Sequence, residues 1–134
     1  FGYTIEIKRP LSESTTDFEY PDLKNGCSNS KPKLLDSISL SCTEIVKFKT
    51  EKYKNARSRI FVISCNDDFN SDNKIDDVAK ELKINHIEVE SIIVSSENIG
   101  KLLCALCHIT GGFSFHPKNI FDGTDLITNN FFYR

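Results

Sequence analysis

The chain has 134 residues, enough for one domain but too few for two of ordinary size, so we expect a single domain over residues 1–134. Hydrophobic residues make up 39% and charged residues 27%, a globular balance, and the formal net charge is −2. No stretch is dominated by Lys and Arg, and no apolar run approaches the roughly 20 residues that a bilayer requires. The composition therefore indicates neither a nucleic-acid partner nor a membrane partner.

The cysteines bear on the cellular compartment. There are five: Cys27, Cys42, Cys65, Cys104 and Cys107. The count is odd, most of them lie in apolar periodic segments, and no Asn-x-Ser/Thr sequon occurs, which favours an intracellular, cytoplasmic protein with reduced thiols. Because the first residue is Phe1 and the chain contains no Met, we expect residue 1 not to be the native start.

The first half of the chain predicts two strands and two helices. Residues 3–8 alternate as in a half-exposed strand, residues 17–23 favour a short helix, and residues 25–32 are typical of a loop. From Leu34 to about Lys52 apolar residues recur at steps of three and four, which predicts an amphipathic helix. The wholly apolar run Ile60–Ile63 is typical of a strand at the centre of a parallel sheet.

The second half continues the alternation of helices and strands. We expect helices over 76–82, 98–110 and 120–132, and strands over 86–94 and 113–116, with Gly111-Gly112 ending the middle helix. This order predicts an α/β domain with a mainly parallel sheet and helices on both faces.

Three segments resemble von Willebrand factor type A (vWA) domains. Leu34–Ile38 is similar to the start of the family's third helix, and Glu44–Tyr53 with the strand at 60–63 is similar to the run into its fourth strand. Leu102–Phe115 is similar to the segment from the last helix to the last strand, where a Thr-Gly-Gly string is common. The resemblance covers nearly all of residues 1–122. It implies a doubly wound sheet in which Phe1-Gly2 ends the family's second strand and the central first strand is missing from this chain.

The same resemblance implies a degenerate metal site. The family binds magnesium through an Asp-x-Ser-x-Ser loop, a Thr before the third helix and an Asp after the fourth strand. The Thr position corresponds to Pro32 and the Asp position to Cys65. Proline has no hydroxyl and a thiol suits a hard cation poorly, so we expect no metal and no cofactor.

The function that this resemblance implies is metal-independent protein binding by a non-catalytic scaffold domain within a larger assembly. Open α/β sheets bind ligands outside the carboxyl ends of their strands, where we expect the loops 26–32, 64–73 and 95–98 to lie. The candidate partner-binding residues are Pro32, Cys65, Asn66, Asp67 and Asp68.

Two alternatives remain open. One is a metal-dependent adhesion domain whose magnesium is held partly by residues absent from this chain. The other is a flavodoxin-like or receiver-like enzyme or signalling domain, although the strand at 60–63 does not end in the Asp that a phospho-acceptor requires. No small-molecule substrate is evident, and none of His86, His108 and His116 belongs to a recognisable nucleophile–base pattern.

Cys104-Ala-Leu-Cys107-His108 matches the c-type haem attachment motif, and its two thiols could also bind zinc or cycle as a dithiol. The partners that haem or zinc would need are not evident, so we interpret both cysteines as core residues of a helix.

Two further segments carry weaker signals. Residues 68–79 partly follow an EF-hand loop but have Asn73 in place of its Gly and Ala79 in place of its last Glu, which favours a solvated acidic loop. The terminal aromatic residues Phe121, Phe131, Phe132 and Tyr133 suit either a core or a contact patch.

Overall fold

The computed structural model of the chain describes residues 34–64, 74–93 and 101–117. The elements in these ranges are α1 (Leu34–Phe48), the 3-10 helix η1 (Glu51–Tyr53), β1 (Ser58–Ser64), α2 (Ile75–Ile84), β2 (Ile87–Ile93), α3 (Lys101–Thr110) and β3 (Ser114–Phe115). Each α-helix and strand corresponds to one that the sequence predicts there, whereas η1 was not predicted as a separate element. The predicted strand at 3–8 and the predicted helices at 17–23 and 120–132 lie outside the described residues.

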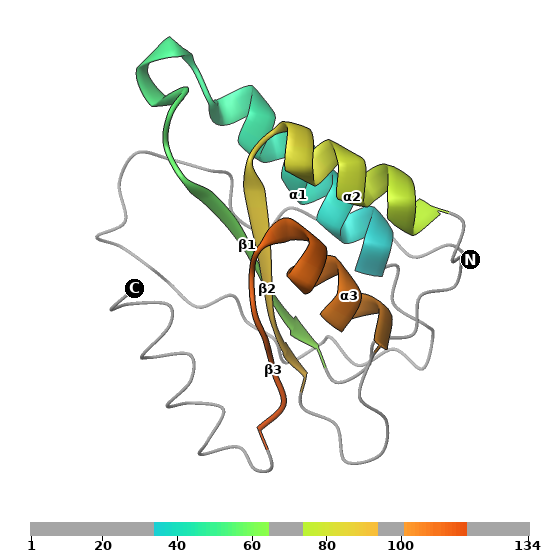
Figure 1. Cartoon of the computed structure of the whole chain (residues 1–134). Coiled ribbons are helices and arrows are strands. Elements are labelled where there is room, and N and C mark those ends of the chain that lie inside the picture. Colours follow the sequence, from blue (N-terminus) through green and yellow to red (C-terminus); the bar gives the residue numbers. More distant parts are fainter. Residues whose placement is uncertain (1–33, 65–73, 94–100, 118–134) are drawn as a thin grey trace, which may run out of the picture.

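The three described strands form a parallel sheet in the order β1-β2-β3. Ile60 pairs with Val89, and Ser91 pairs with Ser114. Helices α1, α2 and α3 lie side by side on one face of this sheet (Figure 1). Right-handed crossovers between strands in sequential order place the connecting helices on the same face, as observed. The prediction of an α/β fold with a parallel sheet is therefore confirmed for this part of the chain.

The core lies between the helices and the sheet. Each helix contributes one apolar stripe with the three- and four-residue spacing that predicted it, and β1 and β2 contribute alternate residues. The buried apolar residues of this core are Leu35, Ile38, Cys42, Ile60, Val62, Val78, Ala79, Leu82, Ile87, Val89, Ile93, Leu103, Leu106 and Cys107. Ile92 is buried too, but on the other face of β2, which it shares with Glu90. Burial of each large aliphatic side chain contributes about 1.5 to 3 kcal/mol.

Helix α1 ends earlier than the predicted limit near Lys52. Its last residue is Phe48, and the chain becomes extended at Thr50 before the short helix η1. The rings of Phe48 and Tyr53 stack across this break, with centroids 5.7 Å apart and planes 14° apart. An aromatic contact between the two helices thus replaces the continuous helix that periodicity predicted.

Strand β1 is less buried than a central strand of a fully covered sheet. Ile60 and Val62 are buried beneath the helices, but Ile63, on the other face of the strand, is 60% exposed. The run Ile60–Ile63 therefore predicted the strand correctly and its burial on both faces wrongly.

His86 belongs to the turn before β2 rather than to the strand. Its φ is +53°, and its backbone N–H donates to the carbonyl of Lys83 at 3.1 Å. A left-handed residue ends α2 and redirects the chain, so β2 begins at Ile87.

Helix α3 ends in a Schellman motif at the predicted glycine pair. The N–H of Gly112 donates to the carbonyl of Cys107 at 2.9 Å, and that of Gly111 donates to the carbonyl of His108 at 3.2 Å. Gly111 has φ +85°, the left-handed conformation that the motif requires. Gly112 lies so close to β2 that a Cβ on it would overlap the carbonyl oxygen of Val89.

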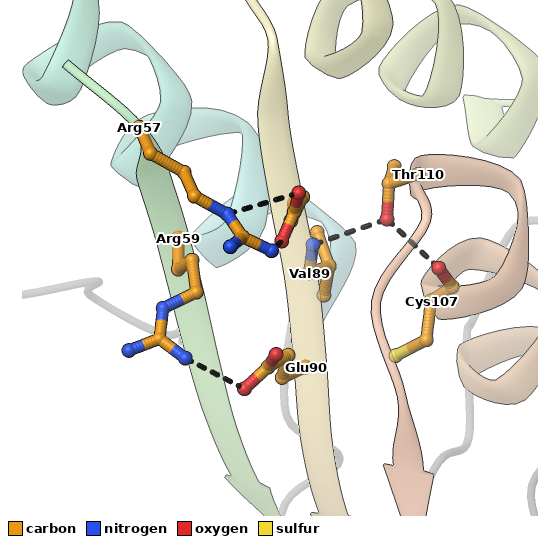
Figure 2. Close-up of polar contacts among 7 residues, drawn as sticks. Arg57, Arg59, Val89, Glu90, Cys107 and Thr110 are labelled. Carbon is orange, nitrogen blue, oxygen red and sulfur yellow. Dashed lines mark hydrogen bonds and ion pairs between the residues drawn. The ribbon is translucent and has the colours of Figure 1, made fainter. Parts of the chain in front are cut away.

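Two ion pairs, one from Arg57 just before β1 and one from Arg59 within it, link this segment to β2 on the face away from the helices (Figure 2). The guanidinium of Arg57 binds the carboxylate of Glu88 in a bidentate manner, with N–O distances of 2.8 and 3.2 Å. Arg59 approaches Glu90 at 3.4 Å, and the side chain of Glu90 is fully buried. The second pair therefore compensates a charge that has been removed from water.

Replacing Gly112 with Ala should lower the free energy of unfolding by about 3 kcal/mol, because the new methyl group meets the backbone of Val89. Gly111→Ala should cost only about 1 kcal/mol, because it strains a left-handed residue in open space. Urea unfolding of both variants measures the difference. Equal losses would contradict the close approach of Gly112 to β2.

The two ion pairs should differ in their contribution to stability. Arg59→Met should lower the free energy of unfolding by about 2 kcal/mol, because it leaves the buried carboxylate of Glu90 without this cation. The loss stays below that of a fully buried pair because Arg59 itself is partly exposed to water. Arg57→Met, the matched control on the exposed pair, should have a much smaller effect. Urea unfolding of both variants checks this order, and the reverse order would show that Glu90 does not depend on Arg59.

Candidate functional site

The residues predicted to bind a partner, Pro32, Cys65, Asn66, Asp67 and Asp68, lie outside the described residues. The structure does show where the segment that contains four of them begins along the chain. Strand β1 ends at Ser64, so Cys65 follows directly at the carboxyl end of the strand. Because β1 and β2 are parallel and in register up to Ser64 and Ile93, both strands end at the same edge of the sheet.

A second polar site lies between α3 and the sheet, and it consists of Cys104, Cys107, Ser91, Ser114 and His116. The Cys107 thiol donates to Ser91 Oγ at 3.4 Å, and the hydroxyls of Ser91 and Ser114 are 2.8 Å apart. Ser114 Oγ is 3.3 Å from both Cys104 Sγ and His116 Nε2, and Cys104 Sγ is 3.2 Å from His116 Nε2. We refer to these five side chains as the thiol–imidazole cluster.

Regular secondary structure brings the cluster together. Ser91 and Ser114 are register partners on neighbouring strands, so their side chains share a face of the sheet. His116 follows Ser114 by two residues and returns to the same side. Cys104 and Cys107 are three residues apart in α3 and therefore point from adjacent turns of the helix toward the strands.

The two ends of the cluster differ in exposure. Cys107 is 1% exposed and Ser91 is buried, whereas Cys104, Ser114 and His116 are half-buried. Burial raises the pKa of the Cys107 thiol to about 11, although the hydrogen bond to Ser91 acts in the opposite direction. Cys107 is therefore an inert structural thiol at neutral pH, whereas Cys104 is only half-buried and lies beside an imidazole.

The contact between Cys104 and His116 permits proton transfer. A neutral imidazole can accept the thiol proton at Nε2, and an imidazolium can return a proton from the same atom. The Cys104 thiol donates to Ser114 Oγ at 3.3 Å, and the Ser114 hydroxyl is also within hydrogen-bond distance of the ring nitrogen. The arrangement is that of a nucleophile with an adjacent base.

The haem-like motif has a structural role at Cys107. Cys107 packs in the core and its thiol donates to Ser91, so the prediction of a core cysteine is confirmed there. The same prediction is wrong for Cys104, which is only half-buried. His108 is exposed, on a different side of α3 from Cys107. In the described ranges, no three His, Cys, Asp or Glu side chains gather as a metal site would require, and no helix has the length and apolar character to cross a membrane.

The sequence prediction missed the pairing of Cys104 with His116. One signal was present: Ser114 and His116 alternate in the short strand that follows the helix carrying Cys104, which places them on one face. Whether that face is the one that α3 covers depends on the register of β3 against β2, and this register cannot be predicted from the sequence alone.

The protein was also compared with known proteins. No protein-family model matches the chain, and a search of curated proteins returned no match. The vWA resemblance therefore remains a hypothesis that depends on the sequence motifs.

The raised pKa of Cys107 makes stability depend on pH in the alkaline range. The folded state holds this proton more tightly than the unfolded state, whose thiol has a pKa near 9.0, so stability is retained below pH 9 and lost as pH rises toward 11. The stability of the wild type relative to Cys107→Ala should fall by about 2 kcal/mol between pH 9 and pH 11. Urea unfolding of both proteins at each pH measures this, and a constant difference would contradict the burial of this thiol.

Proposed function

We propose that this chain is a protein-interaction domain of vWA type that is not an enzyme and binds its partner without a metal ion. The observation that carries the proposal is the sequential strand order β1-β2-β3 with α1, α2 and α3 together on one face (Figure 1).

This arrangement agrees with the second half of a doubly wound sheet. In the order 3-2-1-4-5-6, the last three strands follow one another in sequence, and the right-handed crossovers that lead to them lie on one face. The motif positions assign β1 to the fourth strand and β3 to the last strand of that order. The edge of β1 that faces away from β2 would then pair with the family's central strand, and the remaining helices would lie on the opposite face.

The proposed binding surface is the edge at which β1 and β2 end. Open α/β sheets bind their ligands there because the connecting loops leave the strands at this edge. Cys65 holds the position of the family's metal carboxylate, so the contacts would come from ordinary polar and apolar groups. Ile63, 60% exposed and one residue before the end of β1, offers an apolar contact beside that edge.

A photo-crosslinking amino acid can test this surface in the cells that produce the protein. Introduced at Asp67, it should yield a covalent adduct of discrete mass, which persists when divalent cations are removed with EDTA. The matched control position is Asn55, which is exposed in the turn before β1 and therefore lies at the opposite end of the strand. It should yield no such adduct.

Two outcomes would overturn the proposal. Equal crosslinking from Asp67 and Asn55 would show that the partner does not select the carboxyl edge. Loss of the adduct in EDTA would favour the metal-dependent adhesion function instead.

A further inference from the structure

We propose that Cys104 is a nucleophilic thiol that reacts with hydroperoxides, with His116 as the group that takes up and returns its proton. This is a covalent modification site in the thiol–imidazole cluster, and it is independent of the proposed interaction function. The proposal stands on the 3.2 Å contact between Cys104 Sγ and His116 Nε2, on the adjacent hydroxyl of Ser114, and on the half-exposed position of Cys104.

The reaction needs only the groups present and one peroxide molecule. Cys104 transfers its thiol proton to His116 Nε2, and the thiolate attacks one oxygen of hydrogen peroxide. The S–O bond forms as the O–O bond breaks, and the departing hydroxide takes the proton from the imidazolium and leaves as water. The sulfur is oxidised from thiol to sulfenic acid, the peroxide is reduced, and His116 returns to its neutral form.

Ser114 supports this step from the sheet. Its Oγ accepts a hydrogen bond from the Cys104 thiol at 3.3 Å and lies 3.3 Å from the imidazole nitrogen. Once the sulfur has lost its proton, the Ser114 hydroxyl can turn and donate to the thiolate. Ser91, 2.8 Å from Ser114, can supply a hydrogen bond to that hydroxyl in turn. Hydrogen bonds with neighbouring side chains thus hold Ser114 beside the sulfur.

The chain contains its own control thiols. Cys42 and Cys107 are buried in the core, and among the described residues neither thiol is hydrogen-bonded to a histidine side chain. Peroxide should therefore oxidise Cys104 while it spares both, because access and an adjacent base decide which thiol reacts.

The first experiment uses the wild-type chain. It is treated with hydrogen peroxide at pH 7 in the presence of dimedone, which traps sulfenic acids, and the labelled residue is identified by tandem mass spectrometry. Cys104 should be labelled about tenfold faster than the thiol of free glutathione under the same conditions, because His116 lies in contact with the sulfur to accept its proton and free glutathione has no such base. Labelling of Cys104 no faster than glutathione, or equal labelling of Cys107, would overturn the proposal.

The second experiment assigns the role of the imidazole. His116→Asn should slow the labelling of Cys104 by about tenfold or more, since the proton acceptor is lost. His108→Asn is the matched control, because His108 is an exposed histidine on the same helix as Cys104. It should leave the rate unchanged. Equal rates in the two variants would show that His116 takes no part in the reaction. If a variant folds poorly, the comparison of the wild type with glutathione still tests the proposal.

Discussion

The close approach of the α3–β3 turn to β2 is the contact on which the rest of the described structure depends. Gly112 lies against the backbone of Val89 with no room for a side chain. Beside it, the N–H of Val89 donates to Thr110 Oγ1 at 3.0 Å, and the Thr110 hydroxyl donates in turn to carbonyls of the last turn of α3, among them Cys107 (Figure 2). This contact sets the register in which Ser114 meets Ser91, and the register places His116 beside Cys104.

The two faces of β2 are stabilised by different physical means. Toward the helices, Val89 and Ile93 pack in an apolar core, and Ser91 is the polar residue that links this core to the thiol–imidazole cluster. On the other face, Glu90 is fully buried and is compensated in part by Arg59. A buried ion pair of this kind adds little net stability. Removing its cation is nevertheless costly, because the buried carboxylate is then left uncompensated. The sheet therefore tolerates little change at β2, the strand that carries both sets of contacts.

Periodicity was enough to predict the described α-helices and the strands β1 and β2, because each helix has one apolar stripe and β2 alternates apolar and polar residues before it ends in Ile92-Ile93. It could not predict the break after Phe48, which depends on an aromatic contact with Tyr53, or the exposure of Ile63, which depends on what covers each face of the sheet. The Thr-Gly-Gly string predicted the end of α3 for a local reason that the structure confirms. The pairing of Cys104 with His116 was missed because it depends on strand register, a property of two segments together. The candidate partner-binding residues Pro32 and Cys65–Asp68 lie outside the described residues, and their role remains a prediction.

The geometry of the thiol–imidazole cluster can be measured most directly by the ¹⁵N resonances of the histidine rings. If the α3–β3 turn places His116 against Cys104, then Cys104→Ser, which exchanges the sulfur for a smaller oxygen, should shift the Nε2 resonance of His116. The resonances of the exposed ring of His108 should stay where they are in the wild type. A His116 resonance that does not respond to this substitution would contradict the contact, and with it the register of β3 on which the cluster is built.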